Sequence, residues 1–302
     1  MYMQEIEFTS TADGSHQKAL FYVPGPKAKR PLPLVVGLHQ WSVHLDERRN
    51  GPAYFSQCRK RGWAFIYPEF RGPNDRPQAC ASLLAVQDVI DAVDYAKSHA
   101  AIDEDRIYMV GASGGGMMSL IMAGRYPEIW AAVSVWVPIF DLKKWYADGM
   151  KRGNRYPSML EACCGGAPGS SRGVDGQYRI RSPKSCIKNA ANLSLDINAG
   201  VHDGHIGAVP IYHSFDAFNV LAKAAGFDEK IVGTADIKYM VTQEAIPPAL
   251  RYKKRESFNR MHKVLFRRQA GKVRITIFEG GHEVDPTAAF EFFVGKKRSS
   301  RE

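Results

Sequence analysis

Residues 106–125 read Arg-Ile-Tyr-Met-Val-Gly-Ala-Ser-Gly-Gly-Gly-Met-Met-Ser-Leu-Ile-Met-Ala-Gly-Arg and contain the pattern G-x-S-x-G, with Ser113 at its centre. Arg106 to Val110 has the short apolar character of a buried strand, and Gly114 to Arg125 has a helical pattern. Glycine is needed on either side of the serine where a strand turns sharply into a helix and the backbones approach closely. The stretch therefore predicts a strand–turn–helix unit with Ser113 at the turn.

The same pattern occurs a second time at Gly169-Ser-Ser-Arg-Gly173, around Ser171. No strand pattern precedes this copy and no helical pattern follows it, so we interpret Ser171 as a loop residue and Ser113 as the candidate nucleophile. Two other interpretations of the first copy are a glycine-rich turn that only packs and a dinucleotide-binding loop. The dinucleotide-binding interpretation is not supported, because the stretch lacks the G-x-G-x-x-G that such a loop needs.

Strand and helix patterns alternate on both sides of this unit, which predicts an α/β fold with a mostly parallel sheet covered by helices on both faces. The expected strands are Gln4 to Ser10, Gln17 to Pro24, Pro33 to His39, Trp63 to Tyr67, Arg106 to Val110, Trp130 to Pro138, Leu193 to Gly200 and Val273 to Phe278. The expected helices are Gly51 to Gly62, Ser82 (as cap) to Ala100, Gly114 to Arg125, Pro210 to Ala225, Glu256 to Gln269 and Pro286 to Lys296.

No repeat or linker divides the chain, so we expect one domain over residues 1–302. The stretches at about 140–192 and 227–256 lack a clear periodic pattern. Irregular segments of this length in a compact domain are usually functional. We therefore expect two lid-like insertions at the carboxyl ends of the strands.

A serine hydroxyl needs a histidine base and a carboxylate that orients the base. The strand Leu193 to Gly200 is followed by Val-His-Asp-Gly-His, with Asp203 at its centre, and the last strand is followed by Glu-Gly-Gly-His, ending at His282. The carboxyl ends of parallel strands meet at one edge of a sheet, so we predict a Ser113–His282–Asp203 triad. Asp141 is the rival acid. His202, His205 and His213 lack a matching set of metal ligands, and we expect no metal.

The oxyanion that forms during acyl transfer needs two fixed N–H donors. We predict the amides of Gly114 and Trp41, with Gln40 as the alternative to Trp41. Trp41, Trp145 and Tyr146 are candidate substrate-binding residues, and Tyr156 and Tyr178 add aromatic surface to the same region. The alternative is that the aromatic residues beyond Trp41 form a small core of their own.

Together these residues resemble the α/β-hydrolase superfamily, and within it the single-domain prolyl-oligopeptidase-type esterases, the feruloyl esterases and the polyhydroxybutyrate depolymerases. The resemblance covers about residues 31–295 and depends on the motifs Gly-Leu-His-Gln-Trp (37–41), Tyr-Pro-Glu-Phe-Arg-Gly (67–72), Gly-Ala-Ser-Gly-Gly (111–115), His-Asp-Gly-His (202–205) and Gly-Gly-His (280–282). It implies an eight-stranded sheet, a Ser–His–Asp triad and no cofactor. One departure is His39-Gln40, where the family commonly has His-Gly.

The resemblance implies a serine esterase, and it favours acetyl, feruloyl or methyl esters of a polysaccharide. The substrate is then a small-molecule or polysaccharide ester. A peptidase acting on short peptides and a non-catalytic binding protein with the hydrolase fold are the alternatives.

The formal net charge of +10 raises the question of nucleic acid. Residues 251–274 carry ten Lys and Arg against Glu256, so the excess is local. We expect Arg260, Lys263 and Arg267 on the polar face of the helix Glu256 to Gln269. A solvated face is the ordinary interpretation, and contact with an acidic polysaccharide is the alternative. We expect no nucleic-acid partner.

The remaining features leave several properties open. No apolar run is long enough to span a membrane, and Met1-Tyr-Met-Gln-Glu-Ile-Glu is not a signal peptide. The chain is therefore expected in the cytoplasm, or outside it with a signal removed.

The five cysteines have no CxxC spacing. The two interpretations are idle thiols and a bridge from Cys163 or Cys164 to Cys186. The sequence does not determine the oligomeric state.

Overall fold

The computed structural model describes residues 2–25, 30–45, 51–254 and 256–298. Its strands are β1 (Gln4–Thr9), β2 (His16–Tyr22), β3 (Leu32–Leu38), β4 (Ala64–Pro68), β5 (Ile102–Ala112), β6 (Ala132–Trp136), β7 (Leu195–Gly200), β8 (Val264–Ala270) and β9 (Val273–Phe278). Its α-helices are α1 (Gly51–Arg61), α2 (Leu83–His99), α3 (Gly114–Arg125), α4 (Leu142–Arg152), α5 (Tyr156–Cys164), α6 (Arg172–Ile180), α7 (Tyr212–Ala224), α8 (Thr234–Gln243) and α9 (Pro286–Phe293).

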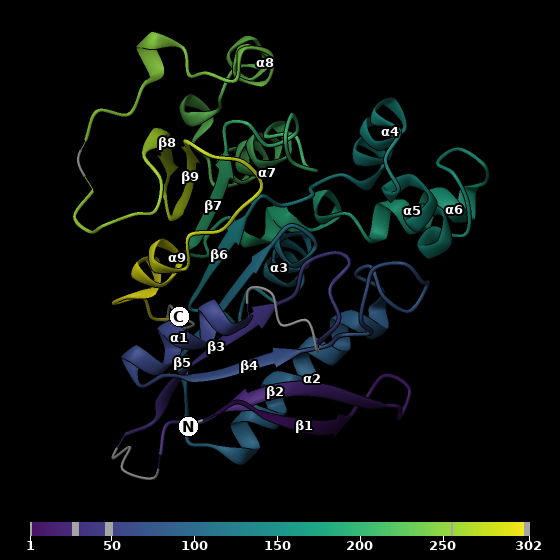
Figure 1. Cartoon of the computed structure of the whole chain (residues 1–302), viewed down its shortest axis with the longest axis vertical. Helices are drawn as coiled ribbons and strands as arrows, with labels where there is room; N and C mark the ends of the chain where they lie inside the picture. The colour runs from purple at the N-terminus through teal and green to yellow at the C-terminus, as the bar shows by residue number, and fades with distance from the viewer. Residues whose placement is uncertain (1, 26–29, 46–50, 255, 299–302) are drawn as a thin grey trace.

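The described strands form one open sheet in the order β1-β2-β4-β3-β5-β6-β7-β9-β8 (Figure 1). The strands from β4 to β9 in this order pair in parallel, whereas β1, β2 and the edge strand β8 pair antiparallel. Helices α2, α3 and α7 pack on one face, and α1 and α9 pack on the other. The predicted α/β fold with a mostly parallel sheet is confirmed.

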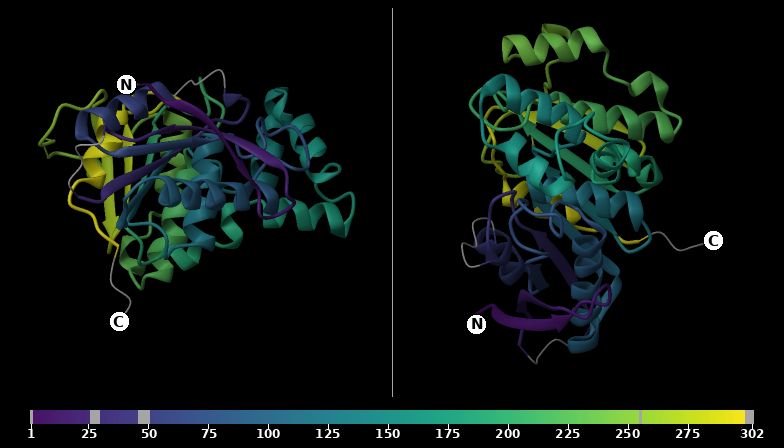
Figure 2. Two further views of the ribbon diagram at one scale, coloured as in Figure 1. Left: turned by 90° about the horizontal axis from the view of Figure 1, so that it is seen from below. Right: turned by 90° about the vertical axis from the view of Figure 1, so that its right-hand side faces the viewer.

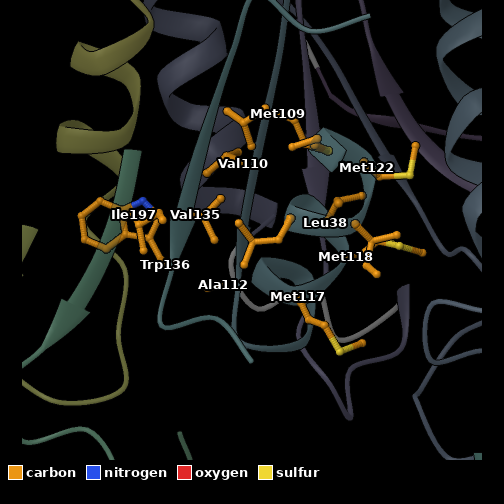
Figure 3. Close-up of a cluster of buried hydrophobic side chains, with 14 of the residues drawn as sticks. Leu38, Met109, Val110, Ala112, Met117, Met118, Met122, Val135, Trp136 and Ile197 are labelled. Carbon is orange, nitrogen blue, oxygen red and sulfur yellow. The ribbon is translucent and has the colours of Figure 1, made fainter. Parts of the chain in front are cut away.

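The central strands β4, β6 and β7 are buried along their whole length, as expected for parallel strands that are covered on both faces. Figure 3 shows Met117, Met118 and Met122 of α3 beside Leu38 of β3, and all four side chains are buried. Burial of a side chain of this size contributes about 1.5–3 kcal/mol relative to exposure. This core supports the start of α3, where Ser113 lies.

Two predicted helix boundaries have local causes in the structure. The Ser82 hydroxyl accepts a hydrogen bond from the Ala85 amide and caps α2. Helix α1 ends before Gly62, which has φ +65°. Both the capping serine and the terminating glycine are visible in the sequence.

The prediction of a helix over Glu256 to Gln269 is wrong. Residues from Val264 onward form β8, which pairs antiparallel with β9, and the residues before it have no regular structure. The strand pairs with β9 from Val264 to Ala270, with an irregularity in register between Val264 and Phe266, so the segment is extended and not helical. Because β8 joins the sheet, the described sheet has nine strands and not eight.

The 140–192 segment is more regular than predicted, because it contains α4, α5 and α6 (Figures 1 and 2). These helices have only 9–11 residues each, so their periodic signal is weak. They form a group at one side of the sheet, which we call the α4–α6 group (residues 142–180). The second insertion contains α8, at the end of the molecule away from β1 (Figure 1).

Two further sequence observations have a structural counterpart. All five cysteines are free thiols, so no bridge joins Cys163 or Cys164 to Cys186. No helix in the described part of the chain combines the length and apolar character that a membrane span needs.

Candidate active site

Ser113 lies at the sharp turn between β5 and α3, with backbone angles φ 58° and ψ −119°. A positive φ is rare for a residue with a side chain and stores strain. The turn is held by a hydrogen bond from the Ser113 amide to the Trp136 carbonyl, at 2.9 Å. This geometry presents a serine at the carboxyl edge of the sheet, as the G-x-S-x-G pattern predicted.

The two outer glycines of the pattern are required by steric contact. A Cβ atom on Gly111 would lie 2.3 Å from the Gly115 carbonyl oxygen, and one on Gly115 would lie 2.4 Å from the Leu38 carbonyl oxygen. Backbone atoms cannot move aside as the end of a flexible side chain can. The close approach of β3, β5 and α3 therefore excludes any other residue at these positions.

His282 and Asp203 are joined by a hydrogen bond between Nδ1 of the imidazole and Oδ2 of the carboxylate, at 2.7 Å. The other carboxylate oxygen of Asp203 accepts a hydrogen bond from the Val209 amide at 3.1 Å, and Asp203 is buried. The His202 amide donates to the Gly280 carbonyl at 3.0 Å, which ties the loop after β7 to the loop after β9. A carboxylate in this setting can orient a histidine base and stabilise its charged form.

Asp141, the rival acid, has different partners. Its carboxylate accepts hydrogen bonds from the Lys143 and Lys144 amides at the start of α4 and forms an ion pair with Lys184 at 2.8 Å. Burial raises the pKa of Asp141, but the hydrogen bond and the charge of Lys184, together with the hydrogen bonds from the Lys143 and Lys144 amides, outweigh this effect, and the pKa is lowered. Asp141 is thus a helix cap, and Asp203 is the acid that contacts His282.

Ser171, the centre of the second G-x-S-x-G copy, caps α6. Its hydroxyl accepts a hydrogen bond from the Val174 amide at 3.2 Å. The capping hydrogen bond accounts for a serine at position 171 without any catalytic role. The expectation that no helix follows Ser171 is therefore wrong, and the two copies of the motif are one strand–turn–helix unit and one helix cap.

The candidate oxyanion donors lie side by side. A Cβ atom on Gly114 would lie 2.7 Å from the backbone nitrogen of Trp41, so the backbones of these two residues are in close contact. The Trp41 loop follows β3 and is held by His39, whose ring nitrogens lie 2.8 Å from the Gln40 carbonyl oxygen and 2.7 Å from the Glu69 carbonyl oxygen. Burial lowers the pKa of His39, despite these two contacts.

Asn74 is a residue of this region that sequence reasoning missed. Its backbone amide and its Nδ2 both donate to the Trp41 carbonyl, at 2.8 and 3.2 Å, and its Oδ1 accepts from the Cys80 amide at 2.6 Å. Asn74 is buried beside Gly114. The available signal was a polar residue shortly after the end of β4, where functional side chains of this fold gather.

Ser113 and His282 line the same cavity, which has a volume of about 530 Å³. Both apolar and polar residues line it. The apolar residues are Trp41, Val43, Pro73, Tyr156 and Met159, and the polar residues are Gln40, Ser42, His44, Asp75 and Arg155. The α4–α6 group contributes Arg155, Tyr156 and Met159 to this wall.

Of the three candidate substrate-binding residues, only Trp41 lines this cavity. Trp145 is buried behind it, with ring centroids 4.7 Å apart, and donates from Nε1 to the Ala208 carbonyl. Tyr146 packs edge-on against Tyr178 and donates to Glu161, inside the α4–α6 group. Trp145 and Tyr146 therefore do not line this cavity, although Trp145 packs against Trp41 and Tyr156, which do.

The remaining histidines of the loop after β7 have carboxylate partners. His202 lies between Glu244 and Glu279, with both nitrogen–oxygen distances 2.8 Å. These hydrogen bonds, first from Glu279 and then from Glu244, raise the pKa of His202. Over the described ranges, no group of three or more His, Cys, Asp or Glu side chains is arranged to hold a metal ion.

The basic stretch 251–274 is partly internal and does not form the exposed helical face that we expected. The Arg260 side chain is 4% exposed and its guanidinium lies over the Trp136 ring. Arg267 forms an ion pair with Glu256 at 2.7 Å, and Arg274 forms one with the buried Asp196 at 2.7 Å. Much of the local positive charge therefore balances carboxylates within the fold.

The open, mostly parallel sheet and the serine at the turn after β5 define an α/β-hydrolase. The whole length of the chain matches the structure of the Pyrococcus horikoshii acylaminoacyl peptidase, with a TM-score of 0.65 and 16% identity. The match covers 43% of that chain. It also matches a thermostable esterase over 98% of its length and 63% of that chain, with a TM-score of 0.57 and 17% identity. At this identity the likeness concerns the fold.

Residues 53–224 match the model of the prolyl oligopeptidase family, and the chain belongs to this family. Among curated proteins, feruloyl esterase B of Talaromyces stipitatus is 24% identical over 74% of this chain and 55% of its own length. Acetylxylan esterase A of Emericella nidulans is 27% identical over 37% of this chain and 38% of its own length. The chain thus spans about half of the length of the first of these two relatives and about two fifths of the second.

Proposed function

We propose that this protein is a serine esterase that cleaves carboxylic esters of carbohydrates through an acyl-enzyme. The observation that carries the proposal is the Asp203–His282 hydrogen bond beside a cavity that also contains Ser113. Curated relatives named feruloyl esterase and acetylxylan esterase support the ester as the bond that is cleaved.

In the first half of the reaction, Ser113 Oγ attacks the ester carbonyl and His282 Nε2 takes the hydroxyl proton. Asp203 holds the Nδ1–H of His282 and stabilises the imidazolium that forms. The amides of Trp41 and Gly114 donate to the oxyanion. When the tetrahedral intermediate breaks down, His282 gives its proton to the leaving alcohol and the acyl group stays on Ser113.

In the second half, water attacks the acyl-enzyme and His282 takes the proton of the water. The second tetrahedral intermediate releases the carboxylic acid, and the proton returns to Ser113 Oγ. Bonds and protons therefore balance without a cofactor. The cavity offers apolar side chains of Trp41, Tyr156 and Met159 that suit an acyl group such as acetyl or feruloyl, and its polar lining residues suit sugar hydroxyls.

The test is a panel of acetylated, feruloylated and methyl-esterified saccharides, assayed with the native chain and with two serine variants. Ser113→Ala removes the proposed nucleophile, whereas Ser171→Ala changes the other G-x-S-x-G serine and is the matched control. We expect turnover of at least one ester class, its loss in Ser113→Ala and its retention in Ser171→Ala. Equal turnover in Ser113→Ala and the native chain would refute the mechanism.

The family description favours a second candidate, a peptidase that acts on short peptides. The same triad would then attack an amide and His282 would protonate the leaving amine. Aminoacyl-nitroanilides assayed beside the esters separate the two functions. A higher kcat/KM for the anilides than for every saccharide ester would favour the peptidase.

A further inference from the structure

Arg155 lies in the turn between α4 and α5, where it is the residue before the first turn of α5. The α4–α6 group that carries it lies beside the carboxyl ends of the central strands (Figures 1 and 2). Arg155 is exposed, and its side chain lines the cavity that contains Ser113 and His282. A permanent cation is thus presented to the space where the substrate binds under the proposed function.

The Arg155 guanidinium forms no ion pair with a carboxylate among the residues that the structure describes. Three lysines around the α4–α6 group differ in this respect, since each has an aspartate partner. Lys143 pairs with Asp175, Lys144 with Asp216 and Lys184 with Asp141, at 2.7–2.8 Å. The charge of Arg155 is therefore available to a bound molecule.

Among the described residues that line this cavity, Asp75 is the one with an acidic side chain, and it is already engaged. Asp75 accepts a hydrogen bond from Arg76 Nε at 3.0 Å, and the two charges form an ion pair. A bound anion therefore meets an uncompensated arginine and a carboxylate whose charge is balanced. The local electrostatics favour a negative group at the Arg155 end of the cavity.

Arg155 also has a fixed contact close to the candidate oxyanion donors. Its Nη2 donates to the Ser42 hydroxyl at 3.2 Å, and Ser42 directly follows Trp41. This hydrogen bond uses one of the five N–H groups of the guanidinium. The remaining donors lie in one plane and match the two oxygens of a carboxylate.

We propose that Arg155 binds a carboxylate of the substrate, so that the preferred esters are those of acidic saccharides, with a uronate near the ester that is cleaved. This inference rests on the proposed function and narrows its substrate class. It also assigns recognition of the acid to the α4–α6 group and not to the basic 251–274 stretch.

The experiment compares two acetylated oligosaccharides that differ in one group. One carries a uronic acid side unit, and in the other the carboxyl of that unit has been reduced to the alcohol. We expect the native chain to favour the acidic substrate by about tenfold in kcat/KM, the scale of one hydrogen bond to a charged group. Added salt should reduce this preference, because the contact is exposed.

The variants are Arg155→Gln, Arg155→Lys and the control Arg172→Gln. Arg172 is an exposed arginine of the same α4–α6 group that does not line this cavity. We expect the ratio of acidic to neutral kcat/KM to fall to about one in Arg155→Gln, to be partly kept in Arg155→Lys and to be unchanged in Arg172→Gln. No preference in the native chain, or the same preference in Arg155→Gln, would overturn the proposal.

A binding experiment tests this inference separately from the proposed function. Ser113→Ala protein is titrated with the deacetylated acidic oligosaccharide by calorimetry, with and without Arg155→Gln. Weaker binding in the double variant supports the role of Arg155 even if no ester is cleaved. Equal binding contradicts it even if the protein proves to be an esterase.

Discussion

The Nδ1 atom of His282 lies 2.7 Å from the Oδ2 atom of Asp203, although the two residues are 79 positions apart. This contact places a hydrogen on Nδ1 when the imidazole is neutral, because a carboxylate only accepts hydrogen bonds. Nε2 is then left with a lone pair, as a general base requires. The pair therefore forms the basis of the mechanism that we propose.

Replacing Asp203 by Asn should lower kcat by a factor of about 10³–10⁴, because the amide does not hold the imidazole in the required tautomer. Asp141→Asn is the matched control. Asn also caps helices, and the lost ion pair with the exposed Lys184 contributes only about 0–1 kcal/mol to stability. Steady-state kinetics of the two variants decides between the acids. A larger loss in Asp141→Asn than in Asp203→Asn would reverse the assignment.

Gly115→Ala should destabilise the chain by about 3 kcal/mol, because the new Cβ would lie 2.4 Å from the Leu38 carbonyl oxygen. Gly176 in α6 is the control, since a Cβ there meets nothing within 4 Å. Gly176→Ala should stabilise the chain by up to about 1 kcal/mol, the difference in helix propensity. Denaturant unfolding measures both free energies. Equal stabilities would show that the backbones around Gly115 separate at little cost.

Asn74→Ala should lower kcat by about tenfold or more with a smaller change in KM, because the Trp41 loop loses the Nδ2 hydrogen bond that fixes a proposed oxyanion donor. Asn74→Asp keeps the acceptor for the Cys80 amide but loses the Nδ2 donor, so it should remain impaired. Gln78→Ala, on the same loop and exposed, is the control. Full activity in Asn74→Asp would show that only the Cys80 contact matters.

The raised pKa of His202 predicts a pH-dependent link between α8 and the loop after β7. Protonated His202 donates to both Glu279 and Glu244, and His205 also lies near Glu244, at 3.6 Å. Since the pKa is higher in the folded chain than in the unfolded chain, the stabilisation is fully present below the unfolded pKa of about 6.5. It is lost as the pH rises through the folded pKa.

The measurement for this link is an NMR titration of the His202 ring in the native chain and in Glu244→Gln. We expect a pKa above that of an unperturbed histidine in the native chain and a lower pKa in the variant. Hydrogen exchange of α8, corrected for the intrinsic pH dependence, should become faster above the folded pKa. A His202 pKa that Glu244→Gln leaves unchanged would exclude the link.

The unit around Ser113 was predictable from the sequence because its cause is local. The glycines at 111 and 115 are required by backbone contacts that any chain with this strand–turn–helix geometry must make. The positions of Asp203 and His282 followed from one rule, that the ends of parallel strands meet at one edge. Their contact is present in the structure, and their catalytic role stays a prediction.

The 256–269 segment was not predictable from apolar spacing alone. Phe258, Met261 and Leu265 have helical spacing, but Met261 is 62% exposed and β8 begins only at Val264. Pairing with β9 determines the conformation of this strand, and such a partner is not visible in a local window. The ion pairs of Arg267 and Arg274 were not predictable from a local window either, because their acidic partners lie elsewhere in the sequence.

The cavity wall was predicted in part, since Trp41 lines it and Trp145 and Tyr146 do not. An aromatic residue in a short helix has the same sequence appearance whether it faces a cavity or a neighbouring helix. Asn74 and Arg155 were missed for a related reason. Their importance comes from contacts with Trp41 and Ser42, which only the folded chain brings near.

Labelling with a fluorophosphonate probe tests the central claim most directly, because the probe reacts with a serine only when a base and an oxyanion site activate it. We predict one adduct per chain, mapped to Ser113 by peptide mass spectrometry. The adduct should be absent in Ser113→Ala, strongly slowed in His282→Ala and unchanged in Ser171→Ala. A folded native chain that takes up no probe, or that carries it on a residue other than Ser113, would contradict the account.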